Sequence, residues 1–171
     1  MDIPSVLNHY NVYSDGEKLI GAGNDLELPE LVNMTDDLDG TAILGTLEEP
    51  ATGQFESMEM TIKWEWLDKK FFRVGRTSSH PQFTIRASQQ VTDSRTGMTD
   101  YKPIKVVVRG KSKSINLGTF SKAKKIGPET KIEIAYIKIV IGGEVRLELD
   151  KLNFKYILNG IDMMKKIRRQ I

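Results

Sequence analysis

Few side chains in this sequence are spaced to carry out chemistry. The two histidines, His9 and His80, have no cluster of carboxylates or thiolates beside them, whereas a zinc site needs three or four such ligands. The acidic turn from Asp36 to Gly40 has oxygen ligands that suit calcium, but it lacks the spacing and the closing glutamate of a calcium loop. We therefore expect no metal site and interpret the acids as a solvated turn.

The motifs of nucleophilic and nucleotide chemistry are also missing. There is no G-x-S-x-G elbow and no P-loop. The segment Gly21-Ala-Gly23 lacks the third glycine of a dinucleotide fingerprint, and no helix is expected after it. The absence of cysteine excludes disulfides, thiolate metal sites and cysteine nucleophiles. We predict no catalytic residue, no cofactor and no enzymatic activity.

Length and composition indicate one soluble globular domain spanning residues 1–171. A chain of 171 residues can bury one proper core, and two domains would be cramped. The apolar fraction of 39% and the charged fraction of 28% are ordinary for a globular protein. No apolar stretch approaches the roughly 20 residues of a membrane helix, and the first residues lack the apolar run of a signal peptide. We expect no membrane insertion.

Charge is divided between two blocks. No Lys or Arg occurs between Lys18 and Lys63, and no Asp or Glu occurs between Asp100 and Glu129. One acidic and one basic block on a small domain suggest a surface with two poles, although solvated loop charges could also cluster in this way. The side chains that we single out in these blocks are Asp36, Asp37, Asp39, Glu48 and Glu49, and Lys111, Lys113, Lys122, Lys124 and Lys125.

The elements that must position these charges are mainly strands. From Met58 to Trp66 every second residue is apolar, which predicts a half-buried strand with Trp64 and Trp66 as core anchors rather than a base-stacking platform. Further strands are predicted over 83–87, 104–109, 130–141 and 145–149. The apolar phase shifts between Ile134 and Ile137, which indicates a β-bulge.

Turns and helices complete the expected fold. Asp15-Gly16 and Gly142-Gly143 predict tight turns. A short helix is expected over 66–74, ended by Gly75. A second is expected at the C-terminus, with Asp162 as its cap and an apolar stripe of Met164, Ile167 and Ile171. Residues 37–54 form a long loop or an extended hairpin, and a loop of that length is usually functional or disordered. The sum is a mainly β fold of antiparallel strands in a sandwich or partial barrel.

The segment Asn11–Leu31, NVYSDGEKLIGAGNDLELPEL, resembles the N-terminal signature of the FII-type major tail tube family of contractile-tailed phages and phage-tail-like bacteriocins. The resemblance continues in order through most of the chain. It departs most over 36–54 and 112–128. The later segments that carry it are Val106-Val-Val-Arg-Gly110, Ala135-Tyr-Ile-Lys-Ile-Val-Ile-Gly142, Asn159-Gly-Ile-Asp162 and Arg168-Arg169.

This resemblance implies two orthogonally packed sheets flanked by a helix. Hexameric rings of such subunits would stack into a hollow tube inside a contractile sheath, with no active site. The implied partners are other copies of the chain, the sheath protein, a baseplate or tube initiator, a tape-measure protein and, in a phage, DNA in the lumen. The implied location is a virion or bacteriocin particle, assembled in the bacterial cytoplasm.

Two sets of contacts are expected in such a tube. Residues 36–54 would reach the neighbouring ring and meet its Lys111–Lys125 region, because opposite charges meet across a head-to-tail contact. The polar strand faces would line the lumen, unless they face solvent or the sheath. The residues expected in that lining are Glu59, Lys63, Glu65, Lys131 and Glu133.

Two other functions remain open. A ring protein of the Hcp type, from a type VI secretion system, would have a similar fold, although the closing segment Asn159–Asp162 with its basic end favours the phage family. A β-barrel module could bind nucleic acid through the basic region 102–125. Such a module would interleave aromatic residues among its bases, and Phe120 is the one aromatic in the basic loop.

Overall fold

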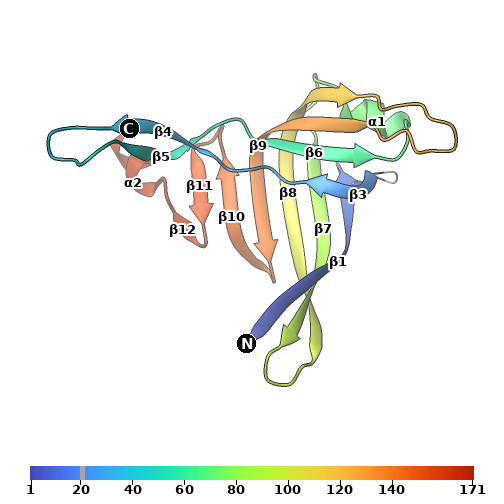
Figure 1. Cartoon of the computed structure of the whole chain (residues 1–171), viewed down its shortest axis with the longest axis horizontal. Helices are drawn as coiled ribbons and strands as arrows, with labels where there is room; N and C mark the ends of the chain where they lie inside the picture. Colours follow the sequence, from blue (N-terminus) through green and yellow to red (C-terminus); the bar gives the residue numbers. More distant parts are fainter. Residues whose placement is uncertain (20–21) are drawn as a thin grey trace.

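The computed structural model describes residues 1–19 and 22–171, which form an antiparallel β structure with two short helices (Figure 1). Part of the Gly21-Ala-Gly23 segment lies outside the described residues. The elements in chain order are β1 (Asp2–Ser14), β2 (Glu17–Lys18), β3 (Ala22–Glu27), β4 (Asn33–Leu38), β5 (Leu47–Phe55), β6 (Glu59–Trp64), α1 (Lys69–Val74), β7 (Gln82–Asp93), β8 (Thr99–Asn116), β9 (Glu129–Ile141), β10 (Glu144–Asp150), β11 (Lys155–Leu158), β12 (Ile161–Asp162) and α2 (Lys165–Gln170).

Strands β8 and β9 belong to two differently oriented parts of the structure. In the large sheet the order is β12-β11-β10-β9-β8-β7-β1-β2. The N-terminal half of β9 also pairs with β6, which pairs with β3. We use the name small sheet for β3, β6, the N-terminal half of β9 and the C-terminal half of β8. It crosses the top of the large sheet at a steep angle (Figure 1), as expected for two packed sheets.

A β-bulge makes this change of direction possible. Arg109 pairs with Tyr136 and Gly110 pairs with Ile134, so Ala135 is the extra residue, as the shift in apolar phase predicted. A Cβ at Gly110 would lie 2.2 Å from the carbonyl oxygen of the residue before Ile134. The bulge therefore requires glycine at this position.

The core fills the space between the two sheets. Met60, Ile62 and Trp64 of β6 are buried, as the alternation predicted. The Trp64 indole donates to Thr130 Oγ1 at 3.2 Å, so its polar atom is satisfied. Trp66 is 43% exposed, and its expected role as a core anchor is wrong. The reason is that β6 ends at Trp64, so the alternation does not extend to it.

Helix α1 covers one side of this core. The Asp68 side chain accepts the N–H of Phe71 at 2.8 Å and caps the helix N-terminus. Phe71 and Val74 are buried, and Gly75 ends the helix. The predicted helix is confirmed, although it begins three residues later than the apolar spacing suggested. Residues 66–68 do not belong to it because the cap lies at Asp68.

Three tight turns join consecutive strands with backbone angles that favour glycine or asparagine. The φ angles are +49° and +84° at Asp15-Gly16, and +58° and +85° at Gly142-Gly143. Asn159-Gly160 has φ angles of +50° and +82° and joins β11 to β12. Such pairs fit the type I′ turns of hairpins, so the sequence predicted the first two turns correctly.

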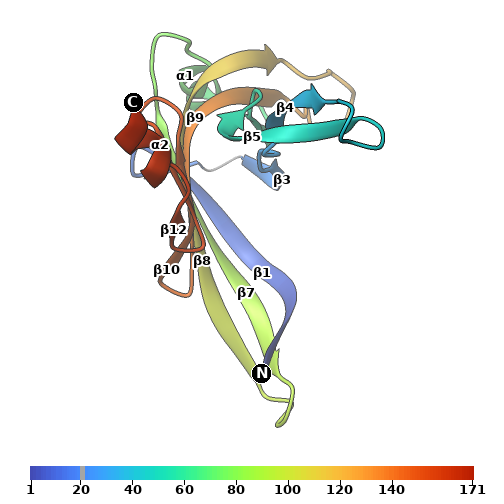
Figure 2. The same cartoon turned by 90° about the vertical axis from the view of Figure 1, so that its left-hand side faces the viewer.

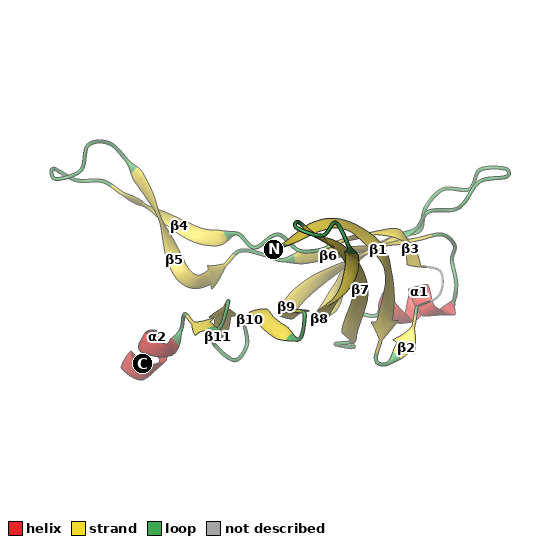
Figure 3. Cartoon of the chain, turned by 90° about the horizontal axis from the view of Figure 1, so that it is seen from below, coloured by secondary structure: helices red, strands yellow, loops and turns green. Residues whose placement is uncertain are grey.

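Strands β4 and β5 form a separate two-stranded sheet, which we call the ribbon. It extends away from the rest of the molecule, beyond the C-terminal helix (Figure 3). The segment expected as a long loop or extended hairpin is therefore a hairpin, with residues 39–46 as its loop. The long strands β1, β7 and β8 project in another direction, away from the small sheet, as a narrow blade (Figure 2).

Helix α2 forms at the predicted place, but its apolar stripe is only partly buried. Met164 is 3% exposed and packs against the ribbon, whereas Ile171 is 84% exposed. The Asp162 side chain accepts the N–H of Met164 at 3.1 Å and pairs with Arg168. The expected role of Asp162 as the helix cap is wrong, because the N-cap is Met164 and makes no side-chain cap bond; Asp162 instead holds the turn before the helix and tethers the helix through Arg168.

Candidate assembly surfaces

The described part of the chain offers surfaces rather than a reaction centre. Within residues 1–19 and 22–171, no three His, Asp or Glu side chains converge to hold a metal ion. No helix in the same ranges is long and apolar enough to cross a membrane. The charged groups singled out from the sequence fall on three surfaces: the wet face of the small sheet, the ribbon, and the basic loop between β8 and β9.

Four of the five expected lumen residues share the wet face of the small sheet. Glu59 of β6 lies directly opposite Glu133 of β9, and Thr61 lies opposite Lys131. Lys63 follows on the same side of β6. The fifth, Glu65, lies just beyond the end of β6 and contacts Lys125.

Lys113 bridges the two opposed acids on this face. Its ammonium pairs with Glu59 and lies 3.8 Å from a carboxylate oxygen of Glu133. The Ser57 hydroxyl also donates to Glu133, at 2.7 Å. The hydrogen bond from Lys113 lowers the pKa of Glu59, and the same bond raises the pKa of Lys113. An in-chain cation therefore offsets the repulsion between two facing carboxylates.

A second β-bulge places Lys113 for this contact. Ser112 pairs with Ile132 and Ser114 with Lys131, so Lys113 is an extra residue in β8. Bulges change the direction of a side chain relative to regular alternation. No pattern in the sequence predicted this bridge, because it depends on register between three strands.

Charge on the wet face of the small sheet is mixed in sign. Lys63 pairs with Glu27 at 2.9 Å, and this contact lowers the pKa of Glu27 and raises that of Lys63. The registers place four acids and four bases on this face: Glu27, Glu59, Glu129, Glu133, Lys63, Lys111, Lys113 and Lys131. Glu30 and Glu56 line the same hollow, so the face is highly charged and mixed in sign.

The ribbon has acids that face each other without such a cation. Asp36 lies directly opposite Glu49, and Asp37 lies directly opposite Glu48. All four are exposed, as is Asp39 in the loop beyond them. No described residue forms an ion pair with any of these acids. Facing like charges destabilise a strand pair, so the ribbon lacks a cationic partner within the described chain.

The five candidate bases divide into two groups. Lys113 and Lys125 are engaged inside the chain, by Glu59 and Glu65 respectively. In the described ranges, Lys111, Lys122 and Lys124 form no ion pair, and all three are exposed. Lys111 lies opposite Glu133 on the wet face of the small sheet, so the loop bases without an ion pair in the described residues are Lys122 and Lys124.

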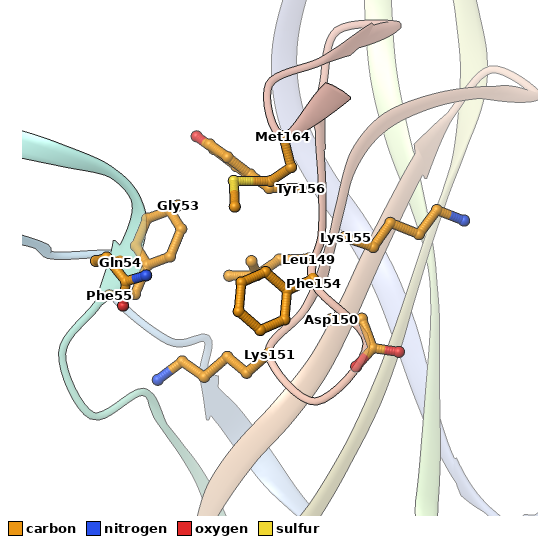
Figure 4. A pocket seen from close by; sticks show the side chains of 10 residues that line it. All are labelled: Gly53, Gln54, Phe55, Leu149, Asp150, Lys151, Phe154, Lys155, Tyr156 and Met164. Atoms are coloured by element: carbon orange, nitrogen blue, oxygen red, sulfur yellow. The ribbon is translucent and has the colours of Figure 1, made fainter. Parts of the chain in front are cut away.

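The base of the ribbon contacts the C-terminal part of the large sheet. The Phe55 ring meets the Tyr156 ring edge to face, with 5.0 Å between centroids. Gly53, with φ +77°, lies against the Met164 side chain. Between these contacts is a cavity of about 210 Å³, into which Phe154 also points (Figure 4). Sequence patterns gave no signal for this contact, since its two sides are far apart in the chain.

Comparisons with known proteins agree with this arrangement. The family model described as "Phage tail tube protein FII" matches residues 4–171. The tail tube protein of Escherichia phage P2 is 22% identical over 174 residues, covering 100% of this chain and 99% of that protein. The sheath/tube terminator of an extracellular contractile injection system (PVC) matches the fold with a TM-score of 0.54 at 11% identity, covering 81% of this chain and 96% of that one.

Proposed function

Since this chain belongs to the FII family of phage tail tube proteins, we propose that it forms hexameric rings that stack head to tail as the hollow inner tube of a contractile tail. The family match over residues 4–171 carries this proposal. Tail tube proteins are structural components of phage or phage-like tails, not enzymes. The function therefore depends on the contacts and charge of the assembled subunits.

The edge of the large sheet supports ring formation. Strand β1 pairs with β7 on one side, while β2 pairs only with Tyr13 and Ser14 on the other. Most of β1 therefore leaves its outer backbone groups free in the described structure. A free edge invites uncontrolled pairing. Contacts between unlike edges of neighbouring copies would cover such edges, and they close into a ring when the rotation between copies permits.

The wet face of the small sheet is the proposed lining of the lumen, with Glu65 at its margin. Proteins bind DNA largely through uncompensated positive charge. The bases Lys63 and Lys113 are each held by an acid on this face. A lining of mixed sign, in which acids hold some of the bases, would give DNA little net attraction.

The ribbon is the proposed contact between rings. Residues 36–54 of one subunit would meet the Lys111–Lys125 region of the next, with Lys122 and Lys124 available for the contact, since Lys111 lies on the wet face of the small sheet. Complementary charge steers association and fixes orientation. The contact would supply the cations that the facing acids of the ribbon lack within the chain.

The proposed partners beyond the tube itself are the sheath protein, a baseplate or tube initiator and a tape-measure protein. The likeness of fold to a sheath/tube terminator supports a place inside a sheath. In a phage particle, DNA would pass through the lumen. Assembly would take place in the bacterial cytoplasm.

Negative-stain electron microscopy of the purified chain at moderate salt tests this function. We expect rings with a central hole, or hollow tubes of uniform width. A wild-type chain that forms neither, alone or on purified baseplates, would contradict the proposal.

The contact between rings is tested by the double variant Lys122→Glu/Lys124→Glu. It should fold and form rings but should not form tubes. The control is Lys165→Glu/Lys166→Glu, which makes the same change of charge on the exposed surface of α2. Normal tubes from the loop variant would show that the basic loop does not form the contact between rings, but they would not contradict the tube function.

A further inference from the structure

A second basic surface lies on the large sheet, on the face turned away from the core. Arg86 of β7 lies directly opposite Lys105 of β8. Lys138 of β9 lies opposite Val107, one step along the same face of β8. Buried Val106 and Val108 show that this face points outward. We call Arg86, Lys105 and Lys138 the basic ladder; the first is exposed and the other two are half-buried.

The acids on the same face do not neutralise the basic ladder. Glu148 lies opposite Lys138, but its carboxylate is held by Lys155 at 3.0 Å and by the Tyr136 hydroxyl at 3.2 Å. Burial raises the pKa of Glu148, and the hydrogen bonds from Lys155 and Tyr136, together with the charges of Lys155 and Lys138, outweigh this effect and lower it. Asp150 is buried and accepts backbone N–H groups of the following turn.

None of the three bases of the basic ladder forms an ion pair within the described residues. Arg86 and Lys105 are like charges directly opposite each other, which is an unfavourable arrangement in an isolated sheet. The basic ladder is thus the counterpart of the ribbon, where acids face each other in the same way.

The ribbon has more acids than one basic loop can cover. Side chains alternate along a strand, so Asp36 and Glu49 lie on one face and Asp37 and Glu48 on the other. A loop that approaches one face leaves the acids of the second face without a partner. This leaves room for a second basic surface on the opposite side of the ribbon.

We infer that the basic ladder receives one acidic face of the ribbon from a neighbouring copy of this chain. The inference rests on the proposed tube function and names a second partner surface for the ribbon. Residues directly opposite across two strands have Cβ atoms about 5 Å apart. The acid pair of the ribbon and the Arg86–Lys105 pair therefore match in spacing, and the arginine can bind a carboxylate through two parallel hydrogen bonds.

The ribbon that fills this site belongs to another copy. Within one chain the ribbon extends beyond α2, away from the strands that bear the basic ladder (Figures 1 and 3). No strand pairing and no ion pair joins the two surfaces in the described residues. The same sequence therefore supplies both halves of a complementary pair that a single copy cannot bring together.

Disulfide crosslinking between single-cysteine variants tests this contact directly, since the chain has no cysteine. A Lys105→Cys chain is mixed with a differently tagged Asp36→Cys or Asp37→Cys chain under mild oxidation. One of the two mixtures should give crosslinked heterodimers at about tenfold or more above the control, corresponding to about 1.4 kcal/mol of preference. The control pairs Lys105→Cys with Ser94→Cys, an exposed position in the β7–β8 hairpin. Crosslinking at the control level in both mixtures overturns the inference.

Charge reversal gives an independent test. The Lys105→Glu/Lys138→Glu variant should lose tube formation, and reversal of one ribbon face, Asp36→Lys/Glu49→Lys or Asp37→Lys/Glu48→Lys, should restore it. Unchanged tubes, or restoration by neither ribbon variant in a folded protein, overturn the inference. If the wild-type chain forms tubes but the cysteine variants do not crosslink, this contact is contradicted and the tube function is not. If the cysteine variants crosslink but the wild-type chain forms neither rings nor tubes, the contact is supported and the tube function is contradicted.

Discussion

The wet face of the small sheet and the ribbon both place acids directly opposite acids, yet only one of them has the compensating cation. Glu59 and Glu133 share Lys113, which a bulge in β8 brings to them. Asp37 and Glu48 on the ribbon have no such partner in the described chain. The difference separates a surface that is electrostatically complete in one subunit from a surface that other subunits must complete.

Neutralising each acid pair should give opposite results, which is the largest effect that we expect. The ribbon variant Asp37→Asn/Glu48→Gln should keep its thermal stability, because it removes a repulsion, and should lose about tenfold or more in tube growth. The sheet variant Glu59→Gln/Glu133→Gln should grow tubes normally but unfold at a lower temperature. Thermal unfolding and electron microscopy of both variants measure the contrast, and equal behaviour of the two would contradict it.

The base of the ribbon tests whether the ribbon is held in place before assembly. Gly53→Ala introduces a Cβ at φ +77° and 2.3 Å from the Met164 sulfur, so it should lower the free energy of unfolding by more than about 1 kcal/mol. Gly45→Ala is the control in the ribbon loop, since Gly45 also has a positive φ, +107°, but has no atom within 4 Å of the new Cβ.

Urea unfolding of the two glycine variants gives the comparison. We expect a clearly larger loss at Gly53 than at Gly45, because the first position suffers both backbone strain and crowding. Equal losses would show that the contact with Met164 does not fix the ribbon.

Removing the bridging cation should make the small sheet resemble the ribbon. Lys113→Met leaves Glu59 and Glu133 facing each other alone, so we expect a modest fall in thermal stability that increases at low salt. Lys124→Met is the matched control, because Lys124 is exposed and forms no ion pair in the described residues. A variant at Lys113 that is as stable as this control would show that the bridge contributes nothing.

Lowering the pH should reduce the stability that the ion pairs of the small sheet contribute, and this is the smallest of the four expected effects. Hydrogen bonds from Lys113 and Lys63 lower the pKa values of Glu59 and Glu27 below their usual 4.5. Each pair then contributes stability that is present above pH 4.5 and is lost as the pH falls through the lowered pKa of the folded state. Unfolding measured against pH should show this loss, and Lys113→Met should show a shallower one.

Much of the fold could be predicted from the sequence because its causes are local. The paired turn residues Gly142-Gly143 require positive φ angles that few other residues adopt. The shift in apolar phase after Ile134 located the bulge, and the apolar alternation located buried Trp64. The prediction that Trp66 is a core anchor failed because an alternating pattern does not show where a strand stops pairing.

The sequence by itself determined that acids and bases occupy separate blocks, that strands dominate, and that no cluster of catalytic groups is spaced for chemistry. Composition and short-range spacing suffice for those conclusions. Only the tertiary structure decided which charges meet. Lys113 finds Glu59, and Arg86 faces Lys105, through register between strands that are distant in the chain. Register depends on the packing of whole sheets and on bulges, so it cannot be obtained from any single segment.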